Sequence, residues 1–187
     1  PAAVPGTQPL PWLLGSSGYS ARLAAELGMP YVFANHFASG ATTGMKIYRD
    51  NFTPGAYGDE PQTFVTANVV VAPTAEEAQL RSEPFQLQMS RLRTGGPMEK
   101  LHLAGDDVRS VMNDGERMVG EEMSKNWIIG DPKSAVAQLE ELAARFDVDE
   151  IMIQPIAGAM EGEDLREDPG RIQTIELLAA ELLGAEA

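Results

Sequence analysis

The sequence contains no cysteine, and this absence excludes two kinds of site. Without thiols, the chain forms no disulfide and offers no thiolate ligand to a metal. Histidine is nearly absent as well, with only His36 and His102, which excludes a histidine-rich metal site. The residues around these two histidines support no Ser-His-Asp triad. We therefore expect no metal, and any chemistry would have to come from an organic cofactor.

Basic residues are also scarce. The chain has 14 lysines and arginines against 28 aspartates and glutamates, a net charge of −14, with no basic cluster. This balance argues against nucleic acid as a partner.

Long hydrophobic runs are missing too: none approaches the ~20 residues that span a bilayer, so we expect no membrane partner. Residues 1–6 lack the charged and apolar regions of a signal peptide, and we expect a cytoplasmic location. The first residue is not methionine, which favours a processed or truncated chain.

The remaining composition is that of an ordinary globular protein. Hydrophobic residues make up 43% of the 187 positions and charged residues 22%. A chain of this length can form one domain with a sizeable core.

One stretch near the N-terminus organises the rest of the sequence. Pro11–Leu14 suits a short buried strand, Gly15–Ser20 is a turn of small residues, and Ala21–Leu27 is a strong helix former closed by Gly28. A strand, a Gly/Ser turn and a helix in this order can direct free backbone N–H groups at an anion. Alternatively, Ser17 or Ser20 simply caps the helix. The turn is neither a Walker A loop nor a G-x-G-x-x-G turn, so pyrophosphate binding has no support.

The sequence predicts four βα units and hence a parallel sheet. The predicted strands are 11–14, 31–34, 63–72 and 150–155. The predicted helices are 20–28, 41–52, 74–93, 132–146 and 171–183. We expect the last helix to bury Ile172, Ile175, Leu178, Ala179 and Leu182. Residues 94–126 interrupt the alternation of strands and helices. They form either an irregular surface segment with one or two short helices or a mobile lid, or insertion, beside a pocket. In that segment we expect His102 to be solvated.

Several of these motifs resemble the bacterial luciferase-like family of flavin-dependent monooxygenases. The resemblance is strongest over Gly15–Ala21 and Leu23–Ala34, and it continues through Asn35–Phe37. Ile128–Pro132 and Asp149–Ile153 extend it toward the C-terminus. The match begins at about residue 5, is weaker over residues 95–126, and covers only the C-terminal half of a family member.

The resemblance implies a (β/α)8 barrel, of which residues 1–187 would form the C-terminal half, with residues 94–126 as an insertion or lid. A complete barrel has eight strands and ~250 residues, so four strands cannot close one. The missing half would precede residue 1. The exposed strands then need cover from that N-terminal half or from a second copy, which makes a homo-oligomer an expectation. A doubly wound arrangement of the four strands is the alternative.

The resemblance also implies a cofactor and a site. Ser17 would bind the phosphate of FMN, with Ser16, Gly18, Tyr19 and Ser20 around it. Reduced FMN from a separate reductase and O2 would then oxidise a small organic substrate. His36 either contacts the flavin or orients the substrate, or it is merely a hydrogen-bonded residue at a strand end.

The family's best-known catalytic histidine would lie in the missing half, so we assign no catalytic residue, name His36 only as a candidate, and expect the fragment alone to be inactive. Two alternatives remain open at this point: an oxidoreductase that uses the deazaflavin F420, and a non-enzymatic flavin-binding or assembly protein.

Overall fold

The computed structural model describes residues 4, 7–37 and 42–184. Its contacts divide the chain into two compact units. The first unit comprises residues 1–66 and 143–152, and the second comprises residues 67–142 and 153–187. Two strands and one helix run from one unit into the other, and the two units are described in turn.

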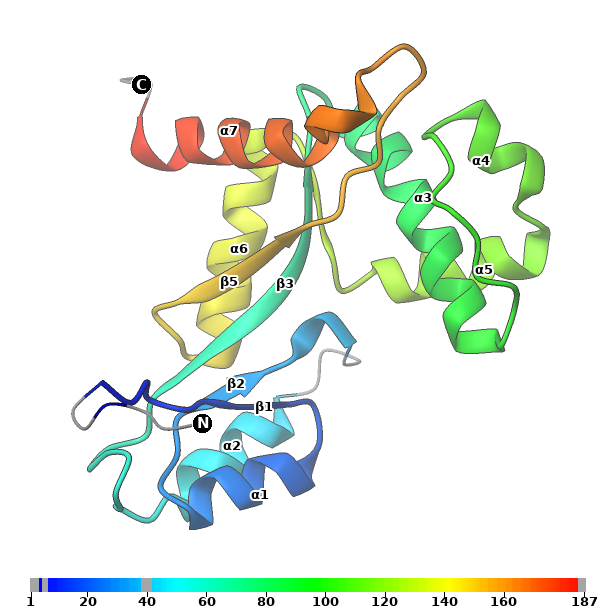
Figure 1. Cartoon of the computed structure of the whole chain (residues 1–187). Coiled ribbons are helices and arrows are strands. Elements are labelled where there is room, and N and C mark those ends of the chain that lie inside the picture. The colour runs from blue at the N-terminus through cyan, green and yellow to red at the C-terminus, as the bar shows by residue number, and fades with distance from the viewer. Residues whose placement is uncertain (1–3, 5–6, 38–41, 185–187) are drawn as a thin grey trace. The chain divides into compact units, whose positions relative to one another are not determined.

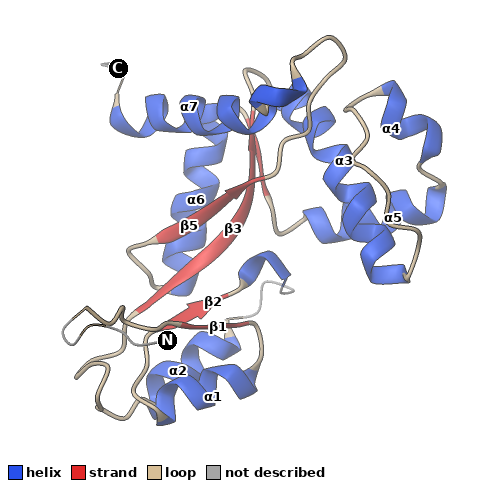
Figure 2. Cartoon of the chain, in the orientation of Figure 1, coloured by secondary structure: helices blue, strands red, loops and turns tan. Residues whose placement is uncertain are grey.

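The first unit is built on parallel strands (Figures 1 and 2). The strand β1 (Leu13–Gly15) is followed by α1 (Gly18–Glu26), β2 (Tyr31–Phe33), the 3-10 helix η1 (Asn35–Phe37) and α2 (Thr43–Asn51). The beginning of β3 (Thr63–Val71) completes it. Leu13 lies opposite Tyr31, and Tyr31 opposite Thr63, with all three strands parallel. The parallel βαβ order predicted from the sequence is therefore confirmed.

Small and aromatic side chains form the core of this unit. The helix α1 buries Ala21, Ala24 and Ala25, and these small side chains allow it to pack closely on the neighbouring helix α2. The rings of Tyr31 and Tyr48 lie 5.3 Å apart, as do those of Phe33 and Phe146. The helix α1 begins two residues earlier than predicted, because Ser17 rather than a later residue is its N-cap. The predicted start of α2 at residue 41 lies outside the described residues.

Gly28 closes α1 in a way that only glycine allows. Its φ is +63°, and an added Cβ would lie 2.7 Å from the carbonyl oxygen of Thr53. Both the left-handed backbone and this close approach exclude a larger residue. The tight exit from α1 leads the chain directly into β2, which is why consecutive strands are parallel neighbours.

The second unit contains the rest of β3 and most of the helices. Its further elements are α3 (Ala75–Thr94), α4 (Asp106–Val111), α5 (Asp114–Ser124), β4 (Ile128–Gly130), α6 (Pro132–Phe146), β5 (Ile151–Pro155), η2 (Leu165–Glu167) and α7 (Pro169–Leu183). The strand β4 is parallel to β3, with Val69 opposite Ile128. The strand β5 also pairs with β3, and just beyond it the Ile156 N–H donates to the carbonyl of Val69 over 3.0 Å.

The strand β4 corrects the sequence-based prediction, which had four strands where the described residues contain five. β4 has only three residues, too few to show either alternation or a long apolar run. Directly after it, the expected cap of α6 is present, since the Asp131 carboxylate accepts the Ser134 N–H over 3.1 Å.

Residues 94–126 contain two short helices, α4 and α5, that are tied to α3 by ion pairs. Arg91 on α3 donates to Glu99 and Glu116, each over 2.9 Å. Arg109 on α4 reaches back to Glu83, with Nη2 2.6 Å from the carboxylate. Asn113 and Glu116 form a capping box at the start of α5. The segment is thus held on α3 by these ion pairs and by a small apolar cluster of Leu87, Val108 and Met112.

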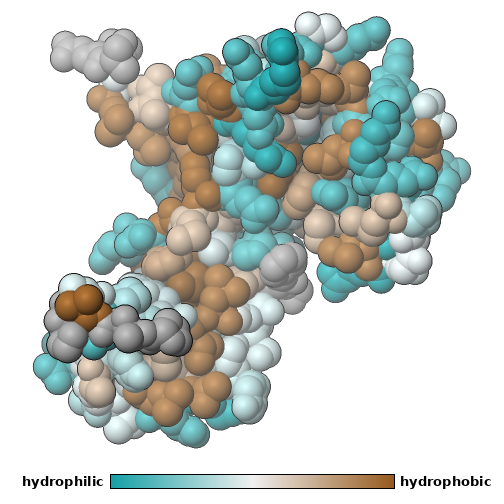
Figure 3. All heavy atoms as spheres, viewed as in Figure 1, coloured by the Kyte–Doolittle hydropathy of each residue, from teal (hydrophilic) through white to brown (hydrophobic). Residues whose placement is uncertain are grey.

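The orientation of α7 differs from the prediction. Leu178 is buried as expected, but Ile172, Ile175 and Leu182 are exposed. The buried face is instead set by Thr174, whose hydroxyl accepts the Val71 N–H over 3.1 Å and lies 3.2 Å from the Val71 carbonyl. These bonds satisfy the end of β3. Hydrophobic surface therefore remains along α7 (Figure 3). Among the described residues, no helix combines the length and apolar character that crossing a membrane requires.

Candidate functional site

The turn between β1 and α1 is shaped by local hydrogen bonds. Ser17 adopts an extended conformation, and its Oγ accepts the backbone N–H of Ser20 over 3.3 Å. The first intrahelical bond runs from the Ala21 N–H to the Ser17 carbonyl, at 3.2 Å. The N–H groups of Gly18 and Tyr19 precede that bond, so the helix itself gives them no acceptor. Ser17 is therefore the N-cap of α1, as the alternative interpretation of the sequence predicted, and it lies beside the backbone N–H groups of Gly18 and Tyr19.

Ser20 and Tyr31 brace the turn from the side of the sheet. The Ser20 hydroxyl donates to the Ser17 carbonyl over 2.9 Å, and the Tyr31 hydroxyl donates to the Gly15 carbonyl over 2.8 Å. The two hydroxyl oxygens are 3.1 Å apart. Burial raises the pKa of Tyr31, which keeps its phenol protonated and able to donate. A Cβ on Gly15 would lie 2.3 Å from Ser20 Oγ, so a residue with a side chain does not fit here unless Ser20 moves.

The outer side of the turn faces solvent. Ser16 and Ser17 are exposed, and Tyr19 is 71% exposed. A Cβ placed on Gly18 would lie 3.6 Å from Nη1 of Arg22, so this guanidinium folds back beside the start of the helix. Arg22 is a further candidate for this site that was not predicted from the sequence. Its spacing, one helical turn after Gly18, is the signal that could have identified it.

His36 lies in η1, directly after β2. Its Nδ1 is hydrogen bonded to the hydroxyl of Thr66, which itself lies 3.5 Å from the carbonyl oxygen of Phe33. Burial lowers the pKa of His36 and so favours the neutral imidazole. The Ala34 N–H donates to the Gly15 carbonyl over 3.0 Å, which joins the carboxyl ends of β1 and β2. The structure thus places His36 and the Gly15–Ser20 turn at the same end of adjacent parallel strands.

Asn35, next to His36, was not singled out in the sequence. It is fully buried, and neither side-chain amide atom has a hydrogen-bond partner in the part of the chain that the structure describes. A buried amide without partners is unusual in a folded protein. No sequence signal distinguishes it from an ordinary strand-end asparagine.

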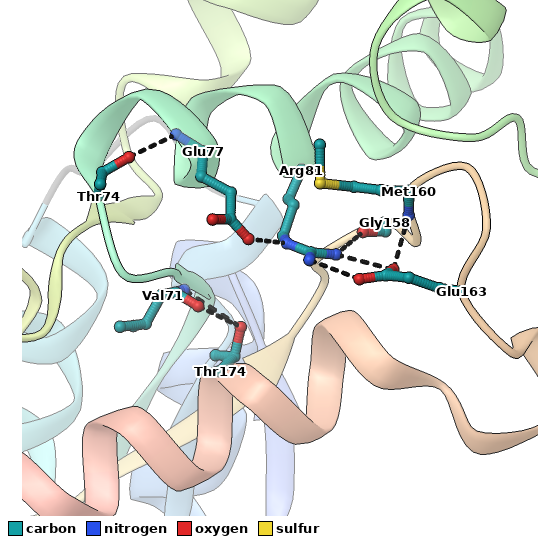
Figure 4. A network of polar contacts seen from close by, with 8 residues as sticks. All are labelled: Val71, Thr74, Glu77, Arg81, Gly158, Met160, Glu163 and Thr174. Carbon is teal, nitrogen blue, oxygen red and sulfur yellow. Dashed lines mark hydrogen bonds and ion pairs between the residues drawn. The ribbon is translucent and has the colours of Figure 1, made fainter.

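The second unit carries its own buried polar network, centred on Arg81 of α3 (Figure 4). The guanidinium donates to Glu77 over 2.8 Å, to Glu163 over 2.7 and 3.1 Å, and to the Gly158 carbonyl over 3.1 Å. The Glu163 carboxylate also accepts the Met160 N–H over 2.7 Å. The hydrogen bond from Arg81 lowers the pKa of Glu163, against the opposing effect of burial. This network fixes the loop that follows β5.

His102 also lies in the second unit and is not solvated, contrary to the expectation from sequence. Its side chain is only 12% exposed, because Nδ1 is held 3.2 Å from the Asp107 carboxylate, which also accepts the Leu103 N–H over 2.8 Å. The described residues contain no group of three histidine, aspartate or glutamate side chains that could hold a metal ion.

The chain is similar in sequence to known bacterial proteins, although no protein-family model matches it. The uncharacterised protein YvbT of Bacillus subtilis strain 168 is 34% identical over 170 residues, which are 90% of this chain and 48% of that protein. A protein of Escherichia coli K12 named luciferase-like monooxygenase is 32% identical over 143 residues, 76% of this chain and 42% of that protein. The chain spans about half the length of these curated relatives.

Solved structures show the same fold. The crystal structure of apo-MsnO8 matches 97% of this chain and 52% of its own, with a TM-score of 0.72 and 26% identity. The oxygenating constituent of 3,6-diketocamphane monooxygenase from Pseudomonas putida, solved in complex with FMN, matches with a TM-score of 0.55 and 20% identity. The matched region covers 91% of this chain and 46% of the monooxygenase chain. The parallel half-barrel expected from the sequence resemblance is therefore confirmed as the fold.

Proposed function

We infer the function from the premise that this chain belongs to the bacterial luciferase-like flavin monooxygenase family. We propose that the protein containing it is a flavin-dependent monooxygenase in which the Gly15–Ser20 turn binds the phosphate of FMN. Reduced FMN, delivered by a separate reductase, would supply the electrons with which O2 oxidises a small organic substrate. The geometry of the turn between β1 and α1 is the observation that supports this assignment.

The residues of the turn fit a phosphate. The N–H groups of Gly18 and Tyr19 lie at the positive end of the α1 dipole, where an anion is favoured. The Ser17 oxygen accepts the Ser20 N–H, and its hydroxyl hydrogen can donate to a phosphate oxygen. The guanidinium of Arg22 adds a positive charge beside Gly18. Together these groups make the turn locally favourable for an anion although the chain has a net charge of −14.

The turn is also preorganised before any ligand arrives. The hydroxyls of Ser20 and Tyr31 hold Gly15 and Ser17 from the sheet side. Because these bonds do not use the exposed face, binding a phosphate requires no rearrangement of the turn. Preorganised donors lose less entropy on binding.

His36 is proposed to orient the flavin or the substrate rather than to transfer a proton through a charged form. Its Nδ1 is already engaged with Thr66, and burial favours the neutral ring. A neutral imidazole whose orientation is fixed by a hydrogen bond is suited to an orienting role.

The rest of the protein is proposed to complete the site. The chain spans about half of its relatives, and hydrophobic side chains of β1 and α7 are exposed, among them Leu14, Ile172 and Ile175. We propose that an N-terminal half of the barrel or a second copy covers them, and that the isolated chain binds FMN weakly or not at all.

Titration of the full-length protein with FMN, followed by fluorescence quenching, tests the proposal. Ser17→Ala should weaken FMN binding by about 1.5–3 kcal/mol, the value of a hydrogen bond to a charged group. Ser17→Asp keeps a good N-cap but places a negative charge against the phosphate, so stability should persist while FMN binding is lost.

Three controls make the result specific. Ser124→Ala removes an exposed serine hydroxyl at the end of α5 and should leave FMN affinity unchanged. Riboflavin, which lacks the phosphate, should bind the wild type and Ser17→Ala equally. F420 titrated in parallel tests the deazaflavin alternative. Equal FMN affinities of wild type and Ser17→Asp would show that the turn is only a helix cap.

A further inference from the structure

The strand β3 carries a buried hydroxyl that packing alone does not explain. Thr66 is 4% exposed, and in the run 64–71 only Thr66 and Asn68 have polar side chains. Burying a hydroxyl costs free energy unless the group is hydrogen bonded. Valine has the same branched shape and is favoured in strands, so packing would select valine at this position. The hydroxyl of Thr66 therefore needs a partner that accounts for it.

The register of the sheet supplies that partner. Phe33, the last residue of β2, pairs with Val65 in the parallel ladder, so Thr66 lies one step beyond the end of β2. The chain turns there into the 3-10 helix η1, which contains His36. Thr66 Oγ1 is hydrogen bonded to Nδ1 of His36 and lies 3.5 Å from the carbonyl oxygen of Phe33. Phe33, His36 and Thr66 all belong to the first unit.

These two contacts of Thr66 determine which nitrogen of His36 carries the proton. A threonine hydroxyl has one hydrogen to donate and two lone pairs with which it can accept. The Phe33 carbonyl is an acceptor only, so satisfying both contacts at once requires the hydroxyl hydrogen to point toward this carbonyl. Nδ1 of His36 must then be the donor to Thr66 Oγ1. Hydrogen-bond networks of this kind are the usual basis for assigning a histidine tautomer.

The surroundings favour a single, well-defined arrangement. Because threonine is branched at Cβ, its χ1 is restricted, and the direction of the Thr66 hydroxyl is restricted with it. Burial lowers the pKa of His36, which favours the neutral ring with only one protonated nitrogen. In a neutral ring protonated at Nδ1, Nε2 has the lone pair. Every group that bonds to Nε2 must then be a hydrogen-bond donor.

We propose that Thr66 is a positioning residue that holds His36 as the Nδ1–H tautomer and so makes Nε2 a hydrogen-bond acceptor. The inference rests on the proposed function for the role of His36, and it specifies the chemistry of the group that His36 orients. A ligand group that meets Nε2 is a donor, either an N–H or a hydroxyl, whereas a carbonyl oxygen does not fit. The same arrangement accounts for the buried hydroxyl of Thr66.

The experiment measures the tautomer directly. The histidine rings of the full-length protein are labelled with ¹⁵N, and both ring nitrogens are observed by NMR above about pH 8, where histidine is neutral. The signals of His36 are those that disappear in His36→Gln. We expect Nδ1 to show the chemical shift of a protonated nitrogen and Nε2 that of an unprotonated one.

Substitutions of Thr66 test whether its hydroxyl sets the tautomer. Thr66→Val keeps the branched shape but should lower the ratio of the Nδ1–H to the Nε2–H tautomer about threefold to tenfold, the effect of one lost hydrogen bond. Thr66→Ser restores the hydroxyl and should restore the wild-type ratio. The matched control is Thr63→Val on the same strand, because the Thr63 hydroxyl donates to Met45 Sδ over 3.3 Å. This control should leave both His36 signals unchanged.

Two results overturn the proposal: a wild-type His36 protonated at Nε2, or the same tautomer ratio in Thr66→Val and the wild type. If Thr66→Val does not fold, the spectra of the wild type and Thr66→Ser still decide, because both must show the Nδ1–H form. The measurement needs no flavin, so its failure is distinct from failure of the flavin proposal, which Ser17→Asp tests. FMN titration of Thr66→Val identifies the source of the donor: weaker binding assigns it to the flavin, and unchanged binding assigns it to the substrate.

Discussion

The turn after β1 and the Arg81 network are both built from polar groups, but they handle those groups in opposite ways. In the turn, the bonds are short-range, the outer face is exposed, and the N–H groups of Gly18 and Tyr19 precede the first helical bond. In the network, Arg81 is buried, and it bonds to a residue 82 positions away in the sequence, Glu163. The turn thus leaves hydrogen-bond donors available to a ligand, whereas the network uses its donors to stabilise the fold. Each of the following experiments disturbs either the turn or the network.

The largest loss of stability is expected at Arg81. Arg81→Leu leaves the Glu77 and Glu163 carboxylates without their common partner in a largely buried place. Breaking a buried ion pair on one side costs about 3–5 kcal/mol. Urea unfolding of the full-length protein should show this loss, with FMN affinity of the remaining folded protein unchanged. Arg166→Leu, which breaks an exposed pair, should cost less than about 1 kcal/mol. Equal effects of the two changes would contradict the assignment of Arg81 to the fold.

A smaller effect is expected for Gly15→Ala. The new Cβ would lie 2.3 Å from Ser20 Oγ and 2.5 Å from Ser20 Cβ, so the turn must shift. Overpacking of this kind costs about 1–3 kcal/mol. FMN binding should weaken together with stability, since the same turn serves both. The double variant Gly15→Ala/Ser20→Gly removes both atoms of the clash and should recover part of the stability. Failure of this recovery would place the strain elsewhere.

The N-cap of α1 gives the next effect in order of size. Ser17→Ala should lower the unfolding free energy by about 1 kcal/mol, the usual value of such a cap. Ser17→Asn retains an acceptor for the Ser20 N–H and should keep most of that stability. Thermal melts of the three proteins measure the difference. If Ser17→Ala and Ser17→Asn melt together, the Ser17–Ser20 bond contributes nothing.

The smallest effect is a change in pH dependence at Glu163. Because Arg81 lowers the pKa of this carboxyl in the folded protein, its contribution to stability is present above the unfolded value of 4.5. That contribution is lost as the pH falls through the lower folded pKa. Wild-type unfolding free energy should therefore decrease below about pH 5, and Glu163→Gln should show a flatter profile in that range. Identical slopes between pH 3 and 6 would argue against the pairing.

The sequence was sufficient where local chemistry decides the structure. The short exit through Gly28 fixes the βαβ order, and Asp131 followed by Pro132 marks the start of α6. The turn at Gly15–Ser20 was located correctly for the same reason, because strand, small residues and helix follow one another directly. Its role as a phosphate site came from the family resemblance and stays a prediction.

Long-range contacts account for what the sequence did not predict. The i,i+4 spacing of Glu77 and Arg81 is visible in the sequence, but nothing in the loop around Glu163 indicates that its carboxylate also pairs with Arg81. The expectation that His102 lies in solvent was wrong. Its hydrogen bond to Asp107 depends on how residues 97–107 fold back, which the sequence does not show. The helix α7 has apolar residues on two faces. Periodicity alone could not show which face is buried, because the choice depends on the hydrogen bond between Thr174 of α7 and Val71 at the end of β3.

The loop between β5 and α7 has fixed ends and a free middle. Arg81 holds it at Gly158 and Glu163, and the start of α7 presses against it at Gly170. Between these points, residues 164–167 are largely exposed and bond mainly to one another. Insertions and deletions should therefore be tolerated there during evolution, while the residues on either side resist them. Proteins of this kind can then differ in loop length at one rim without moving the strand or the helix that the loop joins.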